Sequence, residues 1–313
     1  MDGAEGWGRI VKKLTRKQHI RLLLAAVAAL VMLILIVTFT NDVNIPTWSQ
    51  IFGGGSVSQD DDFVRFIDVG QGDSVLISSN GYNAMIDFGD NTDDGAELMM
   101  DLRRYGIKHI DCMIITHYDS DHIGGADTVI ERLNVENIIL PIRYEEASKS
   151  LAEVDEAIKG SDANVYIAKV GTVINIGEFE LTVVAHYIDE ADTNERSIII
   201  MAEIDGLKFL FTGDADSSIE KRLIEDGLLL DCDVFKAGHH GSKYSNSLKF
   251  LEYITPSYAV ISCGELNSYG HPHNEVIKNF NTVNAKTSRT DTDGDITFYI
   301  KNGALLPTAE FVR

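Results

Sequence analysis

The stretch ITHYDSDHIGG, residues Ile115–Gly125, places two histidines and two aspartates directly after an apolar run. That run, HIDCMIIT at His109–Thr116, is typical of a short strand covered on both faces of a sheet. A loop at the end of such a strand can aim imidazole and carboxylate groups at one point, and this donor set suits Zn²⁺, Mn²⁺ or Fe. The alternative is a solvated Asp-rich turn, followed by an aspartate that caps the next helix. The pattern favours a metal site with four candidate ligands, His117, Asp119, Asp121 and His122.

Other apolar strands also end in polar residues. Asp87 lies in AMIDFG and Asp214 ends FLFTGD, where a carboxylate either forms a turn, bridges two metals or orients a ligand histidine. His239 and His240 follow DVFKAG, and one of these imidazoles can complete a coordination sphere unless both lie on a solvated loop. His271, in YGHPH, either acts as an acid or simply precedes a proline turn.

The order of the predicted elements indicates an α/β fold. Short strands come first, a helix follows at Ala96–Tyr105, and strands and helices then alternate in two successive sets. This order predicts two sheets that face each other with helices outside, a four-layered αββα sandwich. The strands are expected at 63–70, 74–78, 83–89, 109–116, 137–140, 165–170, 180–185, 197–204, 208–212, 233–237, 258–262 and 296–300, and the further helices at 123–133, 145–159, 217–227 and 274–280.

A long apolar segment near the start predicts a membrane anchor. Leu22–Thr40 contains nineteen residues without a charge, and at helical rise this length nearly crosses a hydrocarbon core of about 30 Å. Basic residues precede it, which predicts a cytoplasmic N-terminus. A cleaved signal peptide is the alternative, but the run exceeds the usual length of a signal-peptide core and no A-x-A site follows. We therefore expect a basic cytoplasmic segment at 1–21, a single transmembrane helix at 22–40, a flexible linker at 41–62 and an extracytoplasmic domain at 63–313 of a cell-membrane protein.

Charge and cysteine content limit the function classes. The formal net charge is −21, from 48 acidic and 27 basic side chains, so the surface repels polyphosphate unless metal ions or local basic residues intervene. Lys236, Lys243 and Arg289 lie near the polar loops and are candidates for that local positive charge. The three cysteines are isolated among apolar residues, which predicts core thiols and not a disulfide framework.

Six motifs in order resemble those of the metallo-β-lactamase-fold hydrolases, and more narrowly the branch typified by the hydrolase domain of the ComEC/Rec2 competence proteins. They are FIDVGQGDSVLI, MIDFGD, THYDSDHIGG, FLFTGDAD, FKAGHHGSKYSNS and NSYGHPHNEV, and the similarity extends from about Phe63 to Phe298. The resemblance implies the same αββα sandwich. Because only one apolar span is present, it implies a stand-alone, membrane-tethered relative and not a DNA channel.

The resemblance also implies a ligand set for one or two divalent metal ions, Zn or Mn. It places His117 and Asp119 at one metal position, Asp121 and His122 at the other, Asp214 between them, one of His239 and His240 at the second position, Asp87 as an orienting group, and Asp68 and Asp73 in a structural role. Asp119 stands where the commoner family pattern has histidine. The segment Asn194–Ser197 has no histidine where other members place a further ligand, so the first position is expected to be the weaker one.

The implied function is hydrolysis of a phosphodiester by metal-activated water, with Asp121, Asp87 and His271 as the catalytic residues. The expected partners are a phosphodiester substrate, such as single-stranded nucleic acid, a nucleotide or a cell-envelope phosphodiester, and the lipid bilayer through one helix. A β-lactam substrate is disfavoured because the branch is not one of antibiotic hydrolases. The alternative function is a non-catalytic, membrane-tethered binding module that keeps the fold.

Overall fold

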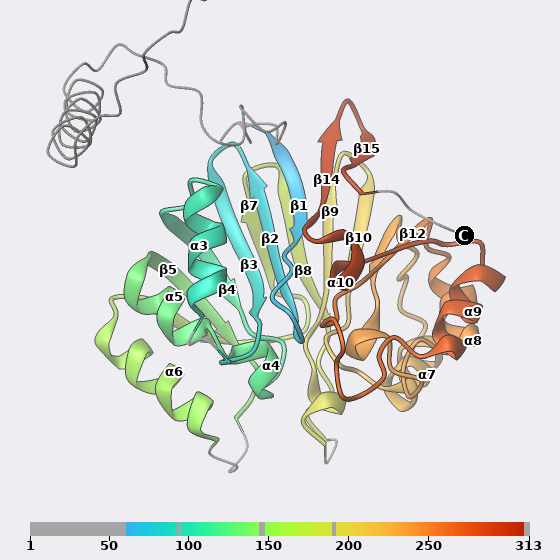
Figure 1. The fold of residues 1–313 in the computed structure, drawn as a ribbon, viewed down its shortest axis with the longest axis horizontal. Helices are drawn as coiled ribbons and strands as arrows, with labels where there is room; N and C mark the ends of the chain where they lie inside the picture. Colours follow the sequence, from blue (N-terminus) through green and yellow to red (C-terminus); the bar gives the residue numbers. More distant parts are fainter. Residues whose placement is uncertain (1–60, 93–94, 144–147, 190–191, 310–313) are drawn as a thin grey trace, which may run out of the picture. The chain divides into compact units, whose positions relative to one another are not determined.

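Two sheets packed face to face, with helices on both outer sides, make up the described part of the chain (Figure 1). The computed structural model describes residues 61–92, 95–143, 148–189 and 192–309, all within the compact unit 57–313. The predicted αββα sandwich is thereby confirmed. The transmembrane helix expected at 22–40 lies outside the described residues, and no helix in the described ranges is long and apolar enough to cross a membrane.

The first sheet has eight strands in the order β15-β14-β1-β2-β3-β4-β5-β6. Neighbours from β3 to β6 run parallel, whereas the other pairs are antiparallel. The bounds are β1 Asp62–Phe66, β2 Ser74–Ser79, β3 Tyr82–Phe88, β4 His109–Ile114, β5 Asn134–Leu140, β6 Asn164–Ile167, β14 Ile296–Lys301 and β15 Ala304–Pro307.

The second sheet has seven strands in the order β13-β12-β11-β10-β9-β8-β7. Its pairs from β10 to β13 are parallel and the rest antiparallel. The bounds are β7 Val173–Ile176, β8 Phe179–Ala185, β9 Ile199–Ile204, β10 Leu207–Phe211, β11 Val234–Lys236, β12 Tyr258–Ile261 and β13 Lys286–Arg289.

The helices cover the outer faces of both sheets. Against the first sheet lie α3 Ala96–Arg104, α4 Ser120–Ile123, α5 Ala126–Arg132 and α6 Lys149–Gly160. Against the second lie α7 Ser217–Glu225, α8 Leu248–Ile254 and α9 Asn274–Thr282. Shorter turns are α10 Thr290–Asp293 and the 3₁₀ helices η1 Asn194–Arg196 and η2 Gly238–Gly241.

Three apolar layers result, one between the sheets and one under each set of helices. In β2, Val75 and Ile77 face the other sheet, while Leu76 packs with the helices. Both faces of the strand are therefore buried, which explains why these strands read as continuous apolar runs. All three cysteines are buried and unpaired, as predicted.

Several predicted boundaries were wrong where glycines bring backbones together. The strand expected at 63–70 ends at Phe66, and the chain then leaves the sheet through Gly70 and Gly72, both with positive φ. The helix expected at 123–133 is two helices, α4 and α5, separated at Gly124 and Gly125. A side chain at Gly124 would lie 2.1 Å from the backbone carbon of Asp90, so only glycine permits this approach. The short strands β7, β13 and β15 and the helices α8 and α10 were not predicted.

Candidate metal centre

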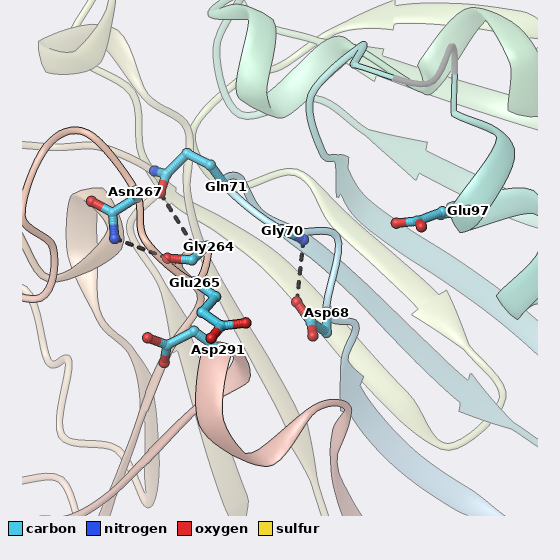
Figure 2. Close-up of a pocket in the computed structure, with 8 residues that line it drawn as sticks. All are labelled: Asp68, Gly70, Gln71, Glu97, Gly264, Glu265, Asn267 and Asp291. Carbon is cyan, nitrogen blue, oxygen red and sulfur yellow. Dashed lines mark hydrogen bonds between the residues drawn. The ribbon is translucent and has the colours of Figure 1, made fainter.

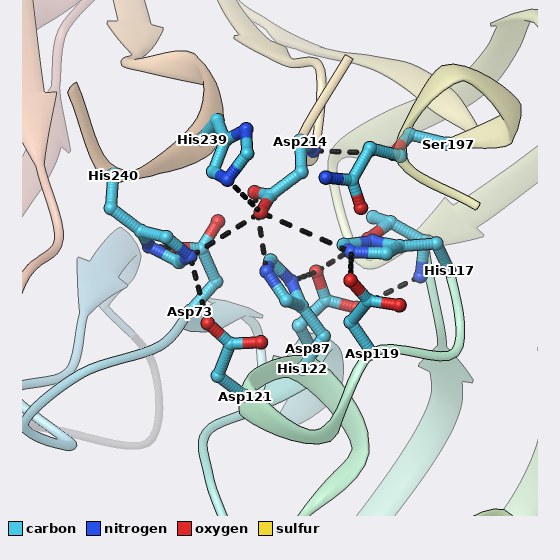
Figure 3. Close-up of polar contacts among 12 residues, drawn as sticks. Asp73, Asp87, His117, Asp119, Asp121, His122, Ser197, Asp214, His239 and His240 are labelled. Carbon is cyan, nitrogen blue, oxygen red and sulfur yellow. Dashed lines mark hydrogen bonds and ion pairs between the residues drawn. The ribbon is translucent and has the colours of Figure 1, made fainter. Parts of the chain in front are cut away.

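Polar residues from both sheets meet where β3, β4, β10 and β11 end (Figure 3). Because the carboxyl ends of parallel strands share one edge of a sheet, side chains that follow such strands are brought together. Asp87 is the second-last residue of β3, and the HYDSDH loop follows β4. Asp214 follows β10, and the two adjacent histidines follow β11. The structure thus unites all the predicted ligands at one place.

Asp214 is at the centre of this cluster. Its Oδ1 lies 3.2 Å from Nε2 of His122, and its Oδ2 lies 3.4 Å from Nε2 of His240. The same Oδ2 is 3.6 Å from Nε2 of His239 and 4.0 Å from Nε2 of His117. One buried carboxylate therefore faces four imidazole nitrogens.

These atoms fit a divalent metal. Two ligands of a tetrahedral zinc ion lie about 3.3 Å apart, given bond lengths of about 2.0–2.1 Å, and the separations around Asp214 are close to this value. Nε2 of His117, His122 and His240 and Oδ1 of Asp214 are buried without a hydrogen-bond partner among the described residues. Because buried polar atoms are normally paired, this set calls for a ligand such as a cation.

The cluster also has strongly altered proton affinities. Burial lowers the pKa of His122 and His240, but the nearby carboxylates, Asp214 above all, outweigh burial and raise it well above the ordinary value. Burial likewise opposes ionisation of Asp214, yet His122 and His240 hold its pKa well below the usual range. The pKa of His117 is lowered, first by burial and then by His122. Metal binding at this site must therefore displace protons.

Asp87 orients two of the histidines from behind. Its Oδ2 accepts hydrogen bonds from Nδ1 of His122 at 2.8 Å and from Oγ1 of Thr116 at 2.7 Å. The hydroxyl proton of Thr116 is thus committed to Asp87, so its oxygen accepts from Nδ1 of His117, 3.0 Å away. In the neutral form of both imidazoles, this network places the proton on Nδ1 and leaves the lone pair of Nε2 directed toward Asp214. Asp87 itself has a left-handed backbone, with φ of 60°, a strained conformation that often accompanies a functional site.

The two aspartates of the HYDSDH loop occupy the solvent side of the cluster. Asp119 is at the N-cap of α4 but makes no capping hydrogen bond, which argues against the turn-and-cap alternative. Its Oδ2 lies 3.9 Å from Nε2 of His117. Oδ2 of Asp121 lies 3.2 Å from Nε2 of His240. Burial opposes ionisation of Asp121, but the contact with His240 outweighs it and lowers the pKa of Asp121 to about 2. The loop therefore presents two carboxylates to opposite ends of the cluster.

Comparison with known proteins identifies the family. Residues 67–265 match the model of the metallo-beta-lactamase superfamily. The chain belongs to this superfamily. Its relatives include three ComEC-type competence proteins, of which the chain spans about a third of the length. It is 30% identical over 257 residues to "ComE operon protein 3" of Bacillus subtilis, covering 76% of this chain and 33% of that protein. It is 27% identical over 291 residues to "Recombination protein 2" of Haemophilus influenzae, covering 91% and 33%.

Two solved structures share the metallo-beta-lactamase fold with this chain. CmlA, a diiron beta-hydroxylase from Streptomyces venezuelae, superposes with a TM-score of 0.53 and 11% identity, over 77% of this chain and 54% of CmlA. Igni18, a metallo hydrolase from Ignicoccus hospitalis, superposes with a TM-score of 0.51 and 18% identity, over 76% of this chain and all of Igni18 (100%). At these identities the likeness establishes the fold alone.

Two hydroxyl groups from the segment Thr193–Ser197 contact the cluster. Oγ1 of Thr193 donates to Oδ1 of Asp119 at 2.8 Å. The backbone N–H of Asp214 donates to Oγ of Ser197 at 3.2 Å. Thr193 thus holds the carboxylate of Asp119, and Ser197 holds the backbone of Asp214. The sequence patterns did not single out either hydroxyl.

Asp73 joins the site, although the sequence suggested only a structural role. Its Oδ1 lies 3.1 Å from Nδ1 of His240, and its Oδ2 lies 2.7 Å from Nζ of the buried Lys236. Burial opposes ionisation, but Lys236 and then His240 hold the pKa of Asp73 well below its ordinary value. Asp73 contacts the Nδ1 side of His240, but Nδ1 also lies 3.1 Å from the carbonyl oxygen of Ser262, and Oδ1 of Asp73 has no hydrogen-bond partner among the described residues. With His122, Asp214 and His240 it forms a buried group whose donor atoms lie close enough together to hold a metal ion, so Asp73 is a further candidate ligand as well as a support for the imidazole.

Gly72 makes that placement possible. A side chain at Gly72 would lie 2.3 Å from the backbone oxygen of Asp121, the same oxygen that accepts the N–H of Asp73 at 3.1 Å. The loop after β1 therefore touches the HYDSDH loop directly. Asp68, five residues before Asp73, lies instead in a separate acidic pocket.

His271 lies at the edge of the cluster. Its ring stacks on that of His240, with centroids 6.2 Å apart and planes 29° apart. Burial, followed by the charge of His240 and His239, lowers the pKa of His271 to about 4. His271 is thus neutral near pH 7, which disfavours the role of general acid that the sequence suggested.

The acidic pocket, defined by Asp68, Glu97, Glu265 and Asp291, lies beside the loop that carries His271 (Figure 2). It has a volume of about 360 Å³, and its lining residues include no basic side chain. Burial, with a contribution from Asp295, raises the pKa of Asp68. The pocket is therefore a region of negative charge that disfavours anions.

Proposed function

We propose that this chain is a membrane-anchored, metal-dependent hydrolase that cleaves a phosphodiester, with single-stranded nucleic acid as the first candidate substrate. The observation that carries the proposal is the central position of Asp214 between two sets of donors. His117 and Asp119 lie on one side, and Asp121, His122 and His240 on the other. Pairs of metal ions about 3.5–4 Å apart typify enzymes that displace a phosphodiester oxygen in line. The names of the relatives refer to competence and recombination, processes that handle DNA.

Each residue has a defined task in this proposal. Divalent ions, Zn or Mn, supply Lewis acidity and a water ligand that ionises near neutral pH. Asp214, His122 and His240 are buried and would hold the ions, whereas the side chains of Asp119 and Asp121 are 41% and 24% exposed. The substrate therefore enters over these two aspartates. Asp87 fixes the tautomers of His117 and His122 from the opposite side.

Hydrolysis is tested with the full-length protein loaded with Mn²⁺ or Zn²⁺. We expect cleavage of bis(p-nitrophenyl) phosphate and of labelled single-stranded DNA, and we expect Asp121→Ala to lower kcat/KM by about 100-fold or more, since even outer-shell changes at metal sites cost 10- to 100-fold. Asp162→Ala is the matched control, because it removes an exposed carboxylate that is distant from Asp121 in the sequence. Unchanged activity of Asp121→Ala would contradict the assignment.

Metal content separates the enzyme from the non-catalytic alternative. A ligand that binds the folded state must stabilise it, so a metal enzyme should gain thermal stability when Mn²⁺ or Zn²⁺ is added. If the purified protein contains less than about half an equivalent of metal and shows no such gain, the result would favour a tethered binding module.

Membrane anchoring is the second part of the proposal. It rests on the uncharged segment 22–40 and on the basic residues before it. When intact cells that express the full chain are treated with protease, we expect the hydrolase domain to be digested. Protection of the domain until the cells are lysed would place it in the cytoplasm.

A further inference from the structure

A row of stacked rings leads from the metal centre to the surface. His240 stacks on His271, and His271 stacks on Tyr269 with centroids 5.5 Å apart and planes 19° apart. His240 and His271 are buried or nearly so, but Tyr269 is 63% exposed. The row therefore ends in an aromatic ring that is open to solvent, two stacking steps from a candidate metal ligand.

The loop that carries Tyr269 is held firmly. Oδ1 of Asn267 accepts the N–H of His271 at 2.9 Å, and its Nδ2 donates to the carbonyl oxygen of His271 at 2.7 Å. The same Nδ2 donates to the carbonyl oxygen of Gly264 at 3.0 Å (Figure 2). The N–H of His273 donates to the carbonyl oxygen of Gly241 at 3.0 Å. These bonds fix the backbone on both sides of His271, so the exposed ring is positioned before any ligand arrives, which lowers the entropic cost of binding.

A second exposed ring and a basic group lie on a segment that is hydrogen-bonded to the Tyr269 loop. Tyr244 is 64% exposed, and Nζ of Lys243 is 5.3 Å from the centre of its ring. The N–H of Lys243 donates to Nδ1 of His273, which connects this segment to the Tyr269 loop. Of the three basic residues noted in the sequence, Lys236 is paired with Asp73 and Arg289 with Asp291, so Lys243 is the one placed to meet an anion.

We propose that Tyr269 forms a base-stacking subsite, in which the nucleobase beside the scissile phosphodiester stacks on the exposed ring, and that the strand continues toward Tyr244 and Lys243. This inference rests on the proposed phosphodiesterase function and names its substrate class as nucleotides. Aromatic rings and cations that alternate along a groove are the usual means of binding single strands without sequence preference. A cell-envelope phosphodiester built from glycerol or a polyol has no planar ring to stack.

The test compares two oligonucleotides of equal length, oligothymidylate and its abasic analogue, as substrates of the metal-loaded full-length protein. We expect Tyr269→Ala to lower kcat/KM for oligothymidylate by roughly 5- to 150-fold, the range for one stacked base, and to leave cleavage of the abasic strand unchanged. Tyr269→Phe should keep wild-type values on both. Tyr166→Ala is the matched control, since Tyr166 is 54% exposed on the edge strand β6. Equal losses on both strands, or no loss on either, would overturn the inference.

A direct readout of stacking separates this inference from the proposed function. An oligonucleotide with 2-aminopurine should lose fluorescence on binding to the wild type and to Tyr269→Phe, but much less on binding to Tyr269→Ala. If the wild type cleaves neither strand yet quenches the probe, the hydrolytic function fails and the stacking subsite stands. If it cleaves both strands and Tyr269→Ala quenches the probe fully, the subsite fails and the hydrolytic function stands.

Discussion

Replacement of Asp214 by asparagine is expected to abolish metal binding and, with it, hydrolysis. The carboxylate faces four imidazoles at 3.2–4.0 Å and is the one group shared by both sets of donors. Asparagine keeps the shape but removes the negative charge and one of the two acceptor oxygens. The loss in kcat/KM should exceed the roughly 100-fold that outer-shell changes cost at metal sites.

Metal analysis after dialysis and thermal unfolding measure this effect without relying on activity. A ligand at about 1,000 times its Kd stabilises the folded state by about 4 kcal/mol, so added Mn²⁺ or Zn²⁺ should raise the Tm of the wild type and leave that of Asp214→Asn unchanged. Asp231→Asn is the matched control, because Asp231 forms an exposed ion pair with Lys208. Full metal content in Asp214→Asn would refute the bridging role.

Asp87→Asn should weaken metal binding by about 10- to 100-fold, although Asp87 faces the imidazoles from the side opposite Asp214. Its Oδ2 accepts from both His122 and Thr116, and an amide NH₂ at that position would donate instead. His122 would then carry its proton on Nε2, the nitrogen that faces Asp214. The variant therefore protonates the Nε2 lone pair that a metal would bind, although the imidazole of His122 itself is retained.

Two measurements check this prediction. Competition with a chromophoric chelator gives the metal affinity, and ¹⁵N chemical shifts of the imidazoles report which nitrogen of His122 is protonated. Thr116→Ser is the matched control, since it keeps the hydroxyl that links Asp87 to His117 by hydrogen bonds. An Nδ1-protonated His122 with unchanged affinity in Asp87→Asn would show that Asp87 does not set the tautomer.

The strand-end motifs were readable in the sequence for a physical reason. Continuous apolar runs are strands buried on both faces, and parallel strands deliver whatever follows them to one edge. The sequence alone therefore predicts that the HYDSDH loop, Asp87 and Asp214 meet, as Figure 3 shows. The αββα order of layers follows from the same alternation of strands and helices.

Tertiary structure alone decided which groups support that edge. His239 and His240 are adjacent and chemically identical, and their left-handed backbones, with φ of 48° and 53°, turn only His240 toward Asp121 and Asp73. Asp73 pairs with Lys236 of the other sheet, and the neighbouring Gly72 permits the close contact with the backbone of Asp121 that accompanies this placement.

The sequence by itself determined the fold class, the location of the site and most of its donor atoms, because these depend on local periodicity and on residue type. The supporting hydroxyls of Thr193 and Ser197 and the exposed stack at Tyr269 depend on how loops from two sheets pack together. Serine, threonine and tyrosine are common in loops for many reasons, so only their distances to the cluster give them a role.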